Sequence, residues 1–110
     1  MKNYSIILTI FFIFCGPSVD CEYENNLAES EVRDLLSKTV KNPYSNEGIA
    51  KNLVIVREIV IKLENHKTFL QDNEECVNLL DNAFSKPSEI NDMLITTKSA
   101  EVQLMASLNK

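Results

Sequence analysis

The segment IAKNLVIVREIVIKLENHKTFL (residues 49–70) decides the fold class, because it can form either one helix or two strands. It is rich in β-branched residues, which favour strands. On a helical wheel, however, one apolar set falls within about 80° and a polar set lies opposite. The apolar set is Ile49, Leu53, Val56, Val60 and Leu63, and the polar set is Lys51, Glu58, Lys62 and Asn65. A strand would have no clean apolar face, so we predict a central, buried helix, with two strands as the alternative.

Helical signals continue on the N-terminal side of this segment. An apolar stripe at helical spacing predicts a helix over residues 24–41. The stripe consists of Ala28, Val32, Leu35, Leu36 and Thr39. The linker NPYSNEG (residues 42–48) should end it, because the residue before Pro43 is disfavoured in the α conformation. Ser45 or Asn46 can then cap the central helix.

Two further helices are expected on the C-terminal side. Asp72 and Glu75 are spaced as in a capping box, which predicts a third helix, and Pro87 fits the first turn of a fourth. Four helices with short connections imply an all-α fold, a small antiparallel four-helix bundle. The apolar face of the third helix is Cys76, Val77, Leu80 and Phe84, and that of the fourth is Ile90, Met93, Leu94, Thr97, Ala100, Leu104 and Leu108.

The first residues of the chain predict a secretory signal peptide. Lys2 supplies a positive charge, and residues 6–15 form an apolar run with the length of a signal-peptide core. That run is too short to cross a bilayer, which takes about 20 apolar residues, so no stable membrane anchor is expected. Because β-branched and aromatic residues also suit a protein core, a buried N-terminal strand or helix is the alternative.

The expected cleavage site divides the chain into two parts. For cleavage after Ser18, the side chains at positions −3 and −1 before the cut are both small, as signal peptidase requires. Cleavage after Asp20 or Cys21 is the alternative. We therefore expect residues 1–18 to be removed. Residues 19–110 should then form a single small helical domain that is secreted into the extracellular space.

Two cysteines remain after that cleavage, Cys21 and Cys76. An even pair in an oxidising compartment predicts one disulfide. It would close a loop of about 55 residues and stabilise the fold by roughly 4 kcal/mol in the chain-entropy model. An up-down bundle supports the pairing, because one helix leads away from Cys21 and the next returns before Cys76. A buried free thiol at Cys76 and an intermolecular bridge are the alternatives.

Charge and residue types predict a protein without catalytic, metal or cofactor sites. The net charge of −5 repels nucleic-acid phosphates and anionic membranes, so we expect no nucleic-acid partner. His66 is the only histidine, too few for a zinc site, and its polar neighbours predict an exposed imidazole. A thiol dyad of Cys76 with His66 could be drawn, but the expected disulfide removes the thiol.

Two classes of function agree with these observations. The first is a secreted, non-enzymatic protein that binds an extracellular protein or receptor, a type found among cytokine-like factors, seminal-fluid proteins and venom components. Val54, Ile55 and Ile61 lie off the main apolar stripe, so they are either packed by flanking helices or exposed as a docking patch. The alternative is an extracellular carrier of a small apolar ligand in the bundle core, lined in part by Met93 and Met105.

Overall fold

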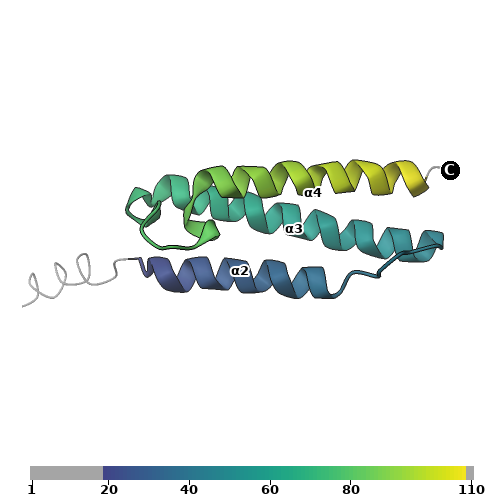
Figure 1. Cartoon of the computed structure of the whole chain (residues 1–110), viewed down its shortest axis with the longest axis horizontal. Coiled ribbons are helices and arrows are strands. Elements are labelled where there is room, and N and C mark those ends of the chain that lie inside the picture. The colour runs from purple at the N-terminus through teal and green to yellow at the C-terminus, as the bar shows by residue number, and fades with distance from the viewer. Residues whose placement is uncertain (1–18, 109–110) are drawn as a thin grey trace, which may run out of the picture.

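The computed structural model describes residues 19–108, which form three α-helices and two short 3₁₀ turns (Figure 1). The all-α fold is confirmed, since no strand occurs within this range. The predicted signal peptide lies outside the described residues. In chain order the elements are α2 (Cys21–Ser37), α3 (Asn46–Asp72), η1 (Glu74–Cys76), η2 (Ala83–Ser85) and α4 (Pro87–Leu108).

The three helices lie side by side, with α3 in the middle (Figure 1). Helix α3 packs against both α2 and α4, more extensively against α4, whereas α2 and α4 have no comparable packing with each other. Ion pairs join the neighbours, from Lys62 to Glu31 on α2 and from Arg57 to Glu101 on α4. The buried core is Cys21, Val32, Ile55, Ile59, Leu63, Leu70, Cys76, Phe84, Ile90 and Leu94.

Helix α3 confirms the prediction of one central helix. Ser45 caps it, because its side chain accepts a hydrogen bond from the backbone N–H of Gly48 at 3.1 Å. Leu53, Val56 and Leu63 of the predicted stripe are buried. The helix thereby places one long apolar face between its two neighbours.

Helix α2 begins and ends earlier than predicted. It begins at Cys21 because the Asp20 side chain accepts a hydrogen bond from the N–H of Tyr23 at 3.0 Å, a cap that the prediction overlooked. It ends at Ser37, before the linker. The Asn52 side chain accepts from the N–H of Val40 at 2.7 Å and donates to its carbonyl at 2.8 Å, so this backbone finds its partners outside a helix.

The predicted third helix, and with it the four-helix bundle, is wrong. The capping box does not form, because Asp72 ends α3 and no side chain caps η1. Asparagine and serine side chains that bond to nearby backbone compete with the helix. Asn82 accepts from the N–H of Phe84, and the Ser85 hydroxyl donates to the carbonyls of Leu80 and Asn82.

Helix α4 confirms the prediction of a helix from Pro87. Its N-terminal half is the better buried, with Ile90 and Leu94 in the core. None of the described helices has the length and apolar character that crossing a bilayer requires.

Candidate functional site

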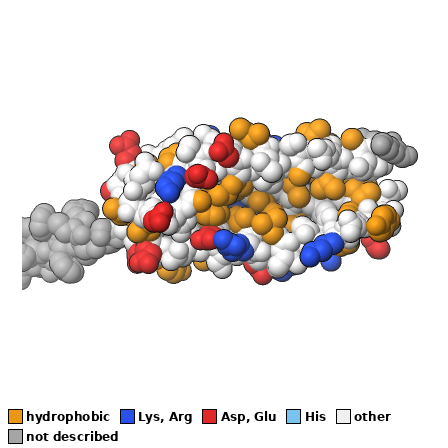
Figure 2. Space-filling view, in the orientation of Figure 1, with side chains coloured by type: hydrophobic (Ala, Val, Ile, Leu, Met, Phe, Trp, Pro, Cys, Tyr) orange, Lys and Arg blue, Asp and Glu red, His pale blue; other side chains and the backbone are white. Residues whose placement is uncertain are grey.

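An apolar groove runs along α3 between α2 and α4, and we call it the α2–α4 groove. Figure 2 shows hydrophobic side chains gathered along the middle of the molecule, between the positions of α2 and α4 in Figure 1. The groove is open to solvent and has a volume of about 370 Å³. Its apolar part is lined by Val32 and Leu36 of α2, Ile59 and Leu63 of α3, and Met93 and Thr97 of α4.

Helix periodicity explains this lining. Val32 and Leu36 are four residues apart, so they occupy the same face of α2, and Ile59 and Leu63 do the same on α3. The floor residues Ile59 and Leu63 are buried, whereas Leu36 on the wall is 54% exposed. A half-exposed leucine above a buried apolar floor is a surface that a further apolar group could cover.

The α4 wall of the groove is acidic. Glu89 and Asp92 project from the first turns of α4 and line the groove together with Thr96. Both carboxylates are exposed, and neither forms an ion pair with another residue of the range 19–108. The groove lining contains no basic side chain. Its charge therefore favours a cationic partner.

The predicted patch of Val54, Ile55 and Ile61 is only partly exposed. Ile55 belongs to the core, with 8% of its surface accessible, so of the two alternatives it is packed and does not form part of a docking patch. Val54 and Ile61 are 61% and 55% exposed and share one face, because they are seven residues apart. Ile61 is about 200° around α3 from Ile59, so this pair faces away from the groove.

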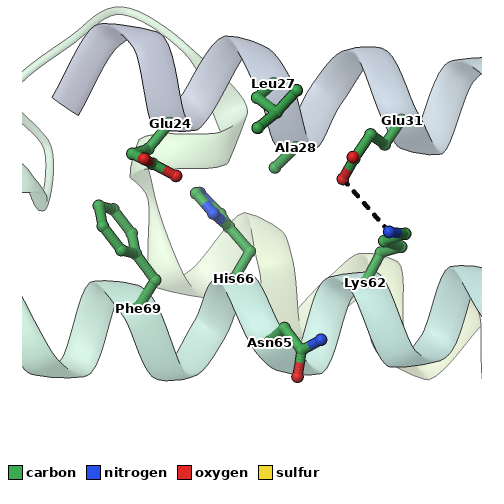
Figure 3. A pocket seen from close by; sticks show the side chains of 8 residues that line it. All are labelled: Glu24, Leu27, Ala28, Glu31, Lys62, Asn65, His66 and Phe69. Carbon is green, nitrogen blue, oxygen red and sulfur yellow. Dashed lines mark ion pairs between the residues drawn. The ribbon is translucent and has the colours of Figure 1, made fainter. Parts of the chain in front are cut away.

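A second hollow, of about 170 Å³, lies between α2 and the C-terminal half of α3 (Figure 3). Its lining is mixed, with Glu24, Leu27 and Ala28 on α2 facing His66 and Phe69 on α3. An ion pair of Lys62 with Glu31, 3.5 Å between nitrogen and oxygen, closes one side.

His66 is buried at the bottom of this hollow, which contradicts the predicted exposed imidazole. Its Nε2 lies 2.7 Å from the carbonyl oxygen of Phe84. Because a carbonyl only accepts, Nε2 carries the proton. The ring also stacks on Phe69 with centroids 5.4 Å apart. Burial lowers the pKa of His66 below 6.5, against the opposing effects of the hydrogen bond to Phe84 and the charge of Glu24.

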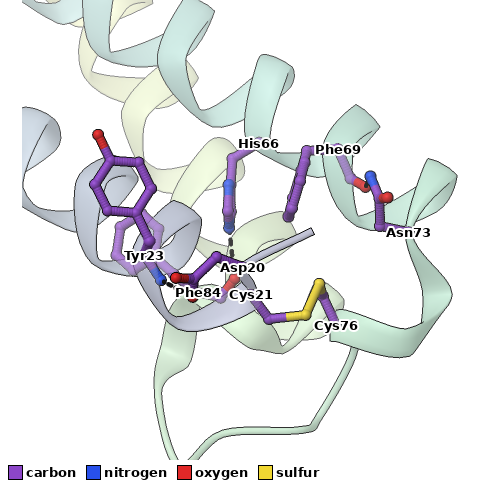
Figure 4. The surroundings of a disulfide bond; sticks show 8 residues. All are labelled: Asp20, Cys21, Tyr23, His66, Phe69, Asn73, Cys76 and Phe84. Atoms are coloured by element: carbon purple, nitrogen blue, oxygen red, sulfur yellow. Dashed lines mark hydrogen bonds between the residues drawn. A yellow bond between two sulfur atoms is a disulfide. The ribbon is translucent and has the colours of Figure 1, made fainter. Parts of the chain in front are cut away.

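The predicted pairing of Cys21 with Cys76 is confirmed by their positions. The two sulfur atoms are 1.99 Å apart, at bonding distance, and join the first turn of α2 to η1 (Figure 4). Figure 4 also places the His66 ring and Phe84 near the bridge. With Cys76 bonded in this way, the alternative thiol dyad with His66 has no nucleophile.

Asn25 is a buried polar residue that the sequence analysis did not single out. Its side chain is completely buried, and neither its amide nitrogen nor its oxygen has a hydrogen-bond partner among the described residues. Such a group costs stability where it lies.

Among residues 19–108, no three or more His, Cys, Asp or Glu side chains converge as a metal site would require. Comparison of the chain with protein-family models, with curated proteins and with solved structures found no match. The function therefore has to be inferred from the chain's own surfaces.

Proposed function

We propose that this protein is a secreted, non-enzymatic helical factor that acts by binding another protein outside the cell. One observation carries the proposal: the α2–α4 groove combines a buried floor at Ile59 and Leu63 with the half-exposed Leu36. An exposed apolar surface of this kind, bordered by charged residues, is typical of protein-binding sites.

Secretion is the second part of the proposal. It is supported by the signal-peptide features of residues 1–18 and by the pairing of Cys21 with Cys76, since disulfides persist in oxidising compartments. When the protein is expressed with its native start in a secretory cell, we expect it in the medium with an N-terminus at or within two residues of Val19. A folded cytosolic protein that keeps Met1 would disprove this part.

A carrier of a small apolar ligand is the second candidate. The volume of the α2–α4 groove, about 370 Å³, falls within the range of small-molecule sites. The ligand would contact Met93 in the groove rather than lie in a closed core, and Met105, at 41% exposure, would not enclose it. Saturable binding of an apolar fluorescent dye that Leu36→Gln abolishes would favour this candidate.

Site-directed photo-crosslinking tests the proposed function. A photoreactive amino acid is placed at Leu36 in the groove, or at Ile61 on the opposite face, which is exposed to the same degree. Each protein is incubated with intact cells of the tissue that expresses it. A discrete protein adduct from either position, lost when unlabelled protein is added in excess, supports protein binding. Failure at both positions, together with saturable dye binding, would replace this function with that of a carrier.

A further inference from the structure

The α2–α4 groove is long enough to bind one more helix. Its α4 wall extends from Glu89 to Thr97, which is about 12 Å at 1.5 Å per residue. This is a little more than two helical turns, the span of apolar anchors at positions i, i+3 or i+4, and i+7 of an amphipathic helix. Ile59 and Leu63 form the buried floor, and Leu36, Met93 and Thr97 above it keep the exposed surface that these anchors would contact.

The carboxylates on the α4 wall indicate which charge a bound helix should carry beside its apolar face. Glu89 and Asp92 supply two exposed carboxylates on the α4 wall, and the lining has no basic residue to neutralise them. A helix with lysine or arginine beside its apolar face would pair with them. A second copy of this chain is a poorer occupant, because a net charge of −5 opposes association with itself.

We propose that the α2–α4 groove binds a basic amphipathic helix of a partner protein, which completes a four-helix arrangement between two chains. This inference rests on the proposed function and makes it specific in location and in partner chemistry. The apolar anchors lie above the buried floor of Ile59 and Leu63, and their main contacts are with Leu36 of α2 and with Met93 and Thr97 of α4. The carboxylates of Glu89 and Asp92 orient the bound helix by attracting its basic flank.

A synthetic helical peptide of about 14 residues provides the probe, since it spans the groove with a turn to spare at each end. It carries leucine at i, i+4 and i+7 with lysine on the flank, and a matched peptide carries glutamate in place of lysine. Titration into the ¹⁵N-labelled secreted protein should shift the amide resonances of Val32, Leu36, Met93 and Thr97. The lysine peptide should bind about fivefold more tightly than the glutamate peptide at low ionic strength, and added salt should reduce the difference.

Two pairs of variants separate the apolar contact from the charge. Leu36→Gln should lower the affinity for the lysine peptide about tenfold. Ile61 is equally exposed but lies on the far face, so Ile61→Gln should leave this affinity unchanged. Glu89→Gln combined with Asp92→Asn should remove the preference for lysine over glutamate. The control, Glu74→Gln with Glu75→Gln, changes the net charge equally but on η1, and should keep the preference. Both carboxylate pairs are exposed, so these variants should fold.

Four results would each overturn the inference. They are the absence of any peptide binding, equal affinity for the two peptides, resonance shifts centred on Val54 and Ile61, and a dimer of this chain that Leu36→Gln dissociates. The proposed function is tested separately. If an extracellular protein crosslinks at Ile61 and no peptide binds in the groove, the protein-binding function is supported and the groove is not its binding site.

Discussion

Removal of the bridge between Cys21 and Cys76 should strongly lower the stability of the fold, and it should loosen α2 more than the other two helices. The bond closes a loop with a sequence separation of 55 residues. In the chain-entropy model this corresponds to roughly 4 kcal/mol at 25 °C. For a domain of this size, about 1 kcal/mol shifts Tm by 4–8 °C, so the expected decrease in Tm is about 15–30 °C.

The packing predicts which helix loosens first. Helix α3 packs less extensively against α2 than against α4, and the bridge holds the first turn of α2 to η1. Without it, the amide hydrogens of α2 should exchange faster than those of α3 and α4. The α3–α4 pair should remain helical.

The suitable variant is Cys21→Ala with Cys76→Ala, measured by thermal unfolding and hydrogen exchange. Both cysteines are buried, so serine would add the cost of a buried hydroxyl, and a serine pair should be less stable than the alanine pair. Reduction of the wild-type protein should have the same effect as the alanine pair. An unchanged Tm after verified reduction, or equal acceleration of exchange in all three helices, would refute this reasoning.

Three further predictions concern buried polar residues. Because the pKa of His66 is lowered in the folded state, the unfolded state binds protons more readily; the free energy of unfolding should be highest above pH 6.5 and decrease as the pH falls from 6.5 toward the lowered pKa. His66→Gln should flatten that part of the curve in urea titrations, and an identical pH dependence in the variant would contradict the assignment. Asn25→Leu should raise the free energy of unfolding by about 1–3 kcal/mol, since it removes a buried amide without partners, and a loss of stability would show that the amide is satisfied. Asn52→Ala should lower it by about 1–3 kcal/mol, because it leaves the N–H and carbonyl of Val40 without their partner, whereas the exposed neighbour Lys51→Ala should change it little.

The groove was not foreseen from the sequence, although parts of its lining were. Val32 and Leu36 were expected on the buried stripe of the first helix, and Met93 on that of the last. Their exposure depends on whether another helix covers them, and that depends on the segment after Asp72. A signal for His66 was present, because it is seven residues from Ile59 and therefore shares the buried face of α3.

The sequence by itself determined the helical class, the course of α3 and α4, the Ser45 cap and the pairing of Cys21 with Cys76. These features follow from helical periodicity, local capping and cysteine count, which act over a few residues or need only the order of elements along the chain. Whether residues 73–86 form a third helix or a loop was decided only in the tertiary structure. There the local helix signal competed with side-chain bonds to the backbone and with burial of Cys76 and Phe84 against α2 and α3. The side-chain bonds are local, but the burial contacts of Cys76 and Phe84 join residues far apart in the chain, so no local pattern reports them, and the open α2–α4 groove is their consequence.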